Sequence, residues 1–175
     1  MARSRWIPDA KFHALLALCQ PENAEALRLS LDYGLRIGDV LRMPASVIQS
    51  GCWNFKEEKT GKHRRVRLSE THRRALSCFA GKFYAFEHRL DPHKHRTRQA
   101  VYKDIKGLAN RLGLRYVSPH SARKIYAVNR YHQSGNDINK VQKLLNHSDP
   151  AVTVLYALAD QMQGSTRGSK GRRLS

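Results

Sequence analysis

The chain has 175 residues, which suits one domain, and 41% of them are hydrophobic, enough to build a core. Its 32 Lys and Arg residues outnumber its 14 acidic residues, so the net charge is +18. A surface with that excess attracts polyanions, and nucleic acid is the most common of them. No apolar run is long enough to span a membrane, and the N-terminus lacks the apolar stretch of a secretion signal.

Cysteine and histidine spacing argues against a metal site or a disulfide framework. Cys19, Cys52 and Cys78 are far apart and form no CxxC pair, so reduced thiols are expected. His93 and His95 lie near an aspartate, but no further ligands stand at suitable spacing. We therefore expect neither a metal nor any other cofactor.

The first third of the chain predicts three helices. An apolar-periodic stretch that opens at Pro8-Asp9 predicts the first, and Pro21 begins a second that Gly34 ends. Residues 35–43 predict a short third helix with Arg36 at its start.

A small sheet is expected next. Residues 47–55 (VIQSGCWNF) predict two short strands around a Ser-Gly turn. Residues 64–68 alternate and predict a third strand, with the intervening turn at Thr60-Gly61. The expected fold class is therefore α+β and mainly helical, with a small three-stranded antiparallel sheet embedded in helices.

The second half of the chain predicts more helices and one loop. We expect helices at residues 69–86 and 97–113, with a loop or linker at residues 88–96 between them. Ser118-Pro119 predicts an N-cap followed by the first helical residue. Two more helices are expected from Asn136-Asp137 and from Asp149-Pro150 to about Met162. The polar, Gly/Ser-rich residues 164–175 predict a flexible basic tail.

Six residues have side chains suited to breaking a phosphodiester through a covalent step: Arg36, Lys59, His120, Arg123, His147 and Tyr156. A tyrosine hydroxyl can attack phosphorus, and arginine forks can hold the non-bridging oxygens. A lysine can protonate the leaving 5′ oxygen, while a histidine can accept a proton or donate to the phosphate. Lys62 stands close to Lys59 and is the alternative for the lysine role.

The order and spacing of these residues resemble the catalytic domain of the tyrosine recombinase (phage integrase) family. The resemblance rests on YGLRIGDVLRM (33–43), KTGKHRRVRL (59–68), SPHSARK (118–124) and LLNHSDPAVTVLY (144–156). The family pattern is an arginine in a GLR turn, a hairpin lysine, an H-x-x-R pair, a second histidine and a tyrosine nine residues later. All six positions are filled in this chain.

The resemblance implies a role for each catalytic position. Arg36 and Arg123 would clamp the scissile phosphate, and Lys59 would be the general acid. His120 would be the general base. His147 would hydrogen-bond a phosphate oxygen, and Tyr156 would form a 3′-phosphotyrosine without metal or ATP.

Charge and resemblance together extend the expected site to DNA contacts. The residues expected to bind DNA are Lys62, Arg64, Arg98, Lys103, Lys106 and Lys124. The partner implied is double-stranded DNA. The chain would form a homotetramer on DNA and would be a monomer or weak oligomer without it. Such a protein would work in the bacterial cytoplasm, at the nucleoid, without membrane contact.

Three departures from the family pattern bear on this expectation. Lys124 follows the H-x-x-R arginine where many members have histidine, and Asn146 replaces the usual glycine before His147. Asp39 replaces a frequent glutamate. We expect residues 1–163 to form one catalytic domain without a separate N-terminal core-binding domain, either as a compact member or as a truncated catalytic domain.

Two other functions stay open from the sequence. A type IB-like topoisomerase shares this chemistry but relaxes DNA without exchanging partners. A recombinase-like DNA-binding domain that needs a partner for activity would retain the same basic surface. The target sequence and the choice among integration, excision, inversion and resolution are not encoded in these motifs.

Overall fold

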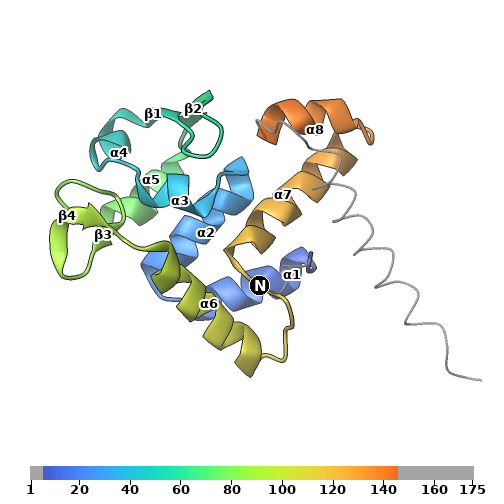
Figure 1. The fold of residues 1–175 in the computed structure, drawn as a ribbon, viewed down its shortest axis with the longest axis horizontal. Coiled ribbons are helices and arrows are strands. Elements are labelled where there is room, and N and C mark those ends of the chain that lie inside the picture. Colours follow the sequence, from blue (N-terminus) through green and yellow to red (C-terminus); the bar gives the residue numbers. More distant parts are fainter. Residues whose placement is uncertain (1–5, 146–175) are drawn as a thin grey trace, which may run out of the picture.

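The computed structural model describes residues 6–145, which form mainly helices with two short β-hairpins (Figure 1). In chain order the elements are α1 (Asp9–Leu18), α2 (Pro21–Tyr33), α3 (Ile37–Leu41), α4 (Ser46–Ser50), β1 (Cys52–Lys56), β2 (His63–Arg67), α5 (Glu70–Ser77), β3 (Glu87–His88), β4 (Asp91–His95), α6 (Arg98–Arg111), α7 (Pro119–Gln133) and α8 (Ile138–Leu145). The predicted fold class, α+β and mainly helical, is confirmed. None of the described helices is long and apolar enough to cross a membrane.

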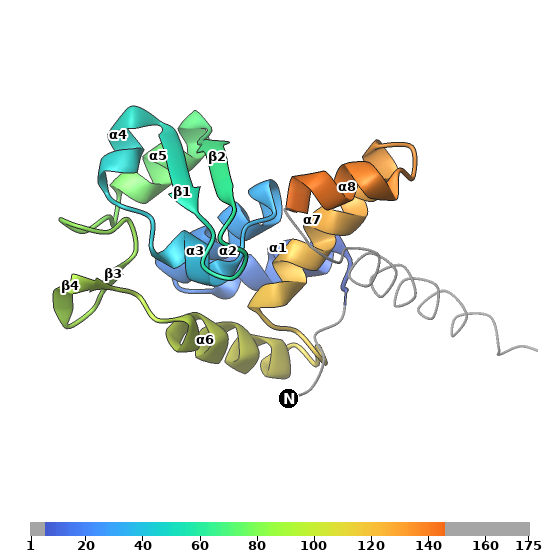
Figure 2. The same ribbon diagram turned by 45° about the horizontal axis from the view of Figure 1, so that its top comes forward.

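Helix α2 lies at the centre of the packing, with α1, α3, α5 and α7 against it (Figure 2). The core is built from aliphatic and aromatic side chains, and Phe12, Leu27 and Ile125 are fully buried in it. Each such side chain contributes on the order of 1.5–3 kcal/mol through burial. A smaller cluster, which includes Tyr126 and Leu145, packs α8 onto α7.

Gly34 ends α2 as predicted and fixes the entry to α3. It has a left-handed φ of 63°, and a Cβ at this position would collide with the ring of Tyr126 on α7. Only glycine satisfies both conditions without strain. The turn places Arg36 at the N-cap of α3, at the start of that helix as the sequence predicted.

The predicted helix starts at Thr97 and Ser118 are confirmed. The Thr97 hydroxyl accepts from the Ala100 amide, and Ser118 forms a capping box with Ser121. Pro119 then occupies the first turn of α7. Because α7 is regular from this point, His120 and Arg123 lie about one turn apart on the helix.

The prediction of a three-stranded sheet is wrong, because the first of the three predicted strands is a helix. Residues Ser46–Ser50 form helix α4, which ends at Gly51 with φ 65°. Val47 and Ile48 are adjacent and both buried, whereas a strand would send one of them to the opposite face. The sheet therefore has two antiparallel strands, with Cys52 opposite Arg67 and Lys56 opposite His63.

Two further boundaries differ from the sequence prediction. Helix α5 ends at Ser77 rather than near residue 86, because the chain turns back and the Ala85 amide bonds the Met43 carbonyl. Strands β3 and β4 pair where a loop was expected at residues 88–96. This hairpin has no fully buried face, so it lacks the apolar alternation by which strands are recognised. His147, Tyr156, the last predicted helix and the tail lie outside the described residues.

A buried histidine makes the free energy of unfolding depend on pH. His72 on α5 lies between two α2 carboxylates, with Nδ1 2.6 Å from Glu25 and Nε2 3.0 Å from Asp32. Burial opposes protonation, but the two carboxylates outweigh it and raise the pKa of His72 from 6.5 to about 9. This stabilisation is complete below pH 6.5, the unfolded value, and is lost as the pH rises through 9.

We therefore expect stability to fall by about 2–3 kcal/mol between pH 6 and pH 9, since one pKa unit corresponds to 1.36 kcal/mol. Urea unfolding at the two pH values measures the change. A His72→Gln variant is the control, and the difference between the two pH values should shrink in it. An equal difference in wild type and variant would exclude His72 as the cause.

Candidate active site

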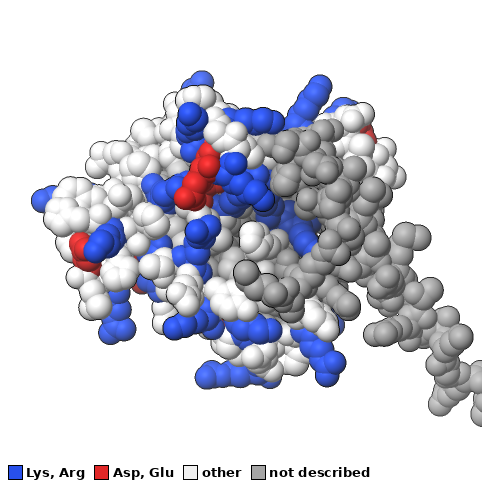
Figure 3. All heavy atoms as spheres, viewed as in Figure 1, with Lys and Arg blue, Asp and Glu red and all other residues white. Residues whose placement is uncertain are grey.

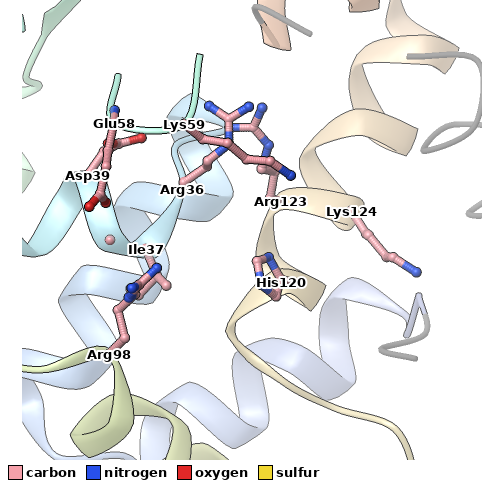
Figure 4. Close-up of a pocket in the computed structure, with 10 residues that line it drawn as sticks. Arg36, Ile37, Asp39, Glu58, Lys59, Arg98, His120, Arg123 and Lys124 are labelled. Carbon is pink, nitrogen blue, oxygen red and sulfur yellow. The ribbon is translucent and has the colours of Figure 1, made fainter. Parts of the chain in front are cut away.

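A basic pocket of about 660 Å³ contains several of the predicted site residues. It is lined by Arg36, Ile37, Gly38, Asp39, Glu58, Lys59, Arg98, His120, Arg123 and Lys124. They come from the α2–α3 turn and α3, from the loop between β1 and β2, and from the N-terminal parts of α6 and α7. Figure 4 shows the cationic ends of Arg36, Lys59 and Arg123 close together, with His120 beside them.

Arg36 lines this pocket and has one unsatisfied donor. Its Nη1 donates to Glu57 Oε2 at 2.6 Å, and its side chain is only 13% exposed. Its Nη2 is buried and has no hydrogen-bond partner among residues 6–145. Leaving a buried charged donor unpaired is costly, so this nitrogen is suited to bind an anionic oxygen.

Arg123 is buried on α7 and joins two segments of the site. Its Nη1 donates to the Gly34 carbonyl at 2.7 Å and its Nη2 to the Leu145 carbonyl at 2.8 Å. Burial, and then the neighbouring charges of Arg36 and Arg64, lower the pKa of Arg123 to about 10. It stays protonated near pH 7, and a guanidinium with two donors engaged keeps three N–H groups for a ligand.

His120 lies at the first turn of α7, and its side chain is directed toward the three cationic groups (Figure 4). Desolvation, followed by the positive charges of Arg123 and Lys59, holds the pKa of His120 below its ordinary value of 6.5. The imidazole is therefore neutral at pH 7 and can accept a proton.

The structure distinguishes the two candidate hairpin lysines by position. Lys59 lines the pocket, whereas Lys62 is exposed at the base of the loop and does not line it. The Lys62 backbone closes the loop instead, because its carbonyl accepts from the Glu57 amide at 3.0 Å. Placement thus favours Lys59 for the lysine role.

The residues expected to bind DNA occupy different environments. Arg98 and Lys124 line the pocket, although Lys124 points away from the other cations (Figure 4). Lys103 lines a second hollow of about 450 Å³ beside α6, while Lys106 is half-buried on that helix. Lys and Arg side chains are spread over the face seen in Figure 3, and acidic ones are few there.

Arg64 has structural contacts that its sequence position did not suggest. Its guanidinium donates to Glu57 Oε1 at 3.1 Å and to the Tyr33 carbonyl, and its side chain is only 12% exposed. These contacts join β2 to the end of α2. A direct DNA contact by Arg64 stays a prediction.

Two acidic residues in this region were missed as site residues by the sequence reasoning. Glu57 is 1% exposed and bonds Arg36, Arg64 and Thr60. Asp39 was noted only as a departure, yet its Oδ1 accepts from Arg42 and from the Glu58 amide. The sequence signal was faint: two adjacent glutamates inside an otherwise basic hairpin.

Comparison with known proteins identifies the family of this chain. The phage integrase family model matches residues 5–162, so the chain belongs to the phage integrase family. Tyrosine recombinase XerD of Rhizobium meliloti (strain 1021) is 34% identical over 134 residues, covering 70% of this chain and 42% of the relative. The probable integrase/recombinase YoeC of Bacillus subtilis (strain 168) is 26% identical over 136 residues, covering 75% of this chain and 74% of the relative.

Solved structures share the fold. The crystal structure of XerA recombinase superposes with a TM-score of 0.67 at 19% identity, covering 98% of this chain and 67% of that one. The XerH site-specific recombinase bound to palindromic difH substrate has a TM-score of 0.66 at 19% identity, covering 95% of this chain and 53% of that one. The chain spans a little under half the length of the XerD relatives it matches.

Proposed function

We propose that this chain is the strand-cleaving domain of a site-specific DNA recombinase, acting through a 3′-phosphotyrosine. The observation that carries the proposal is the convergence of Arg36, Lys59, His120 and Arg123 on one pocket from separate elements. Two arginine forks, a lysine and a neutral histidine are the groups that in-line cleavage of a phosphodiester requires besides the attacking hydroxyl. Family membership and the recombinase names of the relatives support the same proposal.

In the proposed reaction the Tyr156 hydroxyl attacks the scissile phosphorus while His120 takes its proton. Arg36 and Arg123 hold the non-bridging oxygens, with His147 as a further donor, and so stabilise the charge that develops on them. The phenolic O–P bond forms as the P–O5′ bond breaks, and Lys59 gives its proton to the leaving 5′ oxygen. A new 5′ hydroxyl reverses these steps, so the phosphotyrosine conserves the bond energy.

The proposed partner is duplex DNA, with a homotetramer forming on it to exchange strands between two duplexes. We place Arg98, Lys103, Lys106, Lys124 and Lys62 along the backbone contacts, where they supply affinity rather than sequence readout. Residues 1–163 would form the catalytic domain, and the basic residues after 163 would add non-specific attraction.

A covalent-trapping experiment tests the function. Duplexes that bind the chain are first selected from a random-sequence pool and then nicked so that the short cleaved strand diffuses away. The wild-type chain should give an adduct stable to denaturation, in EDTA and without ATP. Its log affinity should fall with log salt at a slope of about −0.9 per phosphate contact. A slope near zero would exclude binding through phosphate contacts, and an adduct on the 5′ phosphate would exclude this chemistry.

A further inference from the structure

We infer that Glu57 is a positioning residue that holds Lys59 and Arg36 in their reactive arrangement before DNA binds. The inference rests on the proposed cleavage function and adds a residue to it. Glu57 does not line the pocket and is only 1% exposed, so it does not reach a bound phosphate directly. Any effect of this residue on the reaction has to pass through the groups that it contacts.

The Glu57 carboxylate joins three segments of the site. Oε2 accepts from Arg36 Nη1 at 2.6 Å and from Thr60 Oγ1 at 2.7 Å, and Oε1 accepts from Arg64 Nη1 at 3.1 Å. Burial alone would raise the pKa of Glu57, but the hydrogen bonds from Thr60 and the two arginines hold it below its ordinary value of 4.5. The carboxylate is thus ionised at any pH at which the chain would act.

The bond from Thr60 to Glu57 closes the loop that presents Lys59. The Glu57 amide bonds the Lys62 carbonyl at 3.0 Å, and the Gly61 amide bonds the Glu57 carbonyl at 2.9 Å. Gly61 has the left-handed φ of 65° that this tight turn requires. Lys59 is thereby held between Glu57 and Thr60, which are joined through their side chains.

Two further contacts, both made by Glu58, anchor the same loop. The Glu58 amide donates to Asp39 Oδ1 at 3.1 Å, and the Glu58 carboxylate pairs with Arg42 at 3.0 Å. Glu58 is therefore bonded directly to the α3 region, whereas Thr60 is connected to it only through Glu57 and Arg36. Because the backbone that carries Lys59 is anchored, only its side chain has to be ordered when a phosphate arrives.

The same carboxylate also directs Arg36. By occupying Nη1 it leaves Nη2, which has no partner among the described residues, as the donor for a ligand. It also offsets part of the positive charge of Arg36 and Arg64. Removing the negative charge should therefore leave DNA affinity unchanged or higher while cleavage becomes slower.

Two variants separate these effects. Glu57→Gln removes the charge and should slow single-turnover cleavage by about ten- to a hundred-fold, the range of one lost charged hydrogen bond. Thr60→Val removes only the side-chain hydrogen bond to Glu57 and should slow cleavage by about five- to ten-fold, as for a weaker bond. Glu70→Gln and Thr71→Val, exposed on α5, are matched controls that should cleave like wild type.

A substrate with sulfur in place of the bridging 5′ oxygen shows whether a variant has mispositioned the general acid or Arg36. When the P–S bond breaks the thiolate leaves without a proton, so a lost general acid no longer matters. The Thr60→Val rate should return to within about two-fold of wild type on this substrate, as a Lys59→Ala rate should. Glu57→Gln should keep part of its defect, because Arg36 is still misdirected.

Amide hydrogen exchange in the DNA-free chain provides a readout independent of activity. Both variants should speed exchange at Gly61, whose amide bonds the Glu57 carbonyl in the closed loop. Unchanged exchange, or a Thr60→Val defect that persists equally with sulfur, would overturn the inference. If the wild-type chain cleaved neither substrate, the proposed function would fail, while the exchange result would still decide whether Glu57 orders the loop.

Discussion

A Tyr156→Phe variant should bind duplex DNA as tightly as wild type and form no covalent adduct. The phenyl ring keeps the shape of the side chain but lacks the oxygen that would bond to phosphorus. The effect should be all-or-none, because no rate of attack remains once the nucleophile is removed. Nicked duplexes incubated with each chain and separated under denaturing conditions give the measurement directly.

A second tyrosine serves as the control for this experiment. Tyr102 lies on α6 and is 46% exposed, so its hydroxyl is accessible but lies outside the residues that line the pocket. Tyr102→Phe should form adduct at the wild-type rate. Adduct formation by Tyr156→Phe would show that another residue attacks the phosphate and that the nine-residue spacing from His147 was misinterpreted.

An Arg36→Lys variant should cleave about a hundred- to a thousand-fold more slowly, the loss seen when one transition-state donor is removed. Lysine keeps the positive charge but has a single nitrogen, so it cannot bond Glu57 and also retain a second, unpaired donor, as Arg36 does. DNA affinity should fall much less than cleavage, since the long-range attraction to phosphate is retained. Single-turnover cleavage and equilibrium binding measure the two quantities separately.

Arg111→Lys is the matched control, because Arg111 is exposed in the last turn of α6. It should change neither cleavage nor binding by more than about two-fold, as is usual for a surface substitution. Cleavage by Arg36→Lys within a few-fold of wild type would mean that the fork of Arg36 does not contact the reacting phosphate. In that case Arg123 would be the only arginine left in the proposed clamp.

Local chemistry explains which parts of the fold were predictable. Gly34, Thr97 and Ser118 each act within a few residues of themselves. The C-terminal end of α2 and the first residues of α6 and α7 were therefore predicted correctly. Residues 47–49, which lie in α4, were misread as a strand because a short run with apolar neighbours fits either structure. The β3–β4 hairpin was missed because its polar residues lack a two-residue apolar repeat.

The site, like the fold, was predictable only in part. The motif spacing identified Arg36, Lys59, His120 and Arg123 as candidates, and the structure brings all four to one pocket. The sequence left Lys59 and Lys62 as alternatives, and only the register of the hairpin loop placed Lys59 in the pocket. His147 and Tyr156 stay predictions from the sequence alone.

By itself, the sequence predicted the class of chemistry and determined the order of most helices, because side-chain type, spacing and capping are local properties. The tertiary structure decided what those side chains contact. Glu57 is separated from Arg36 by 21 residues and from Arg64 by seven, and no local pattern links them. A buried carboxylate acquires its role only when folding removes water and brings the two arginines to it, so the proposed support of the catalytic lysine was visible only in three dimensions.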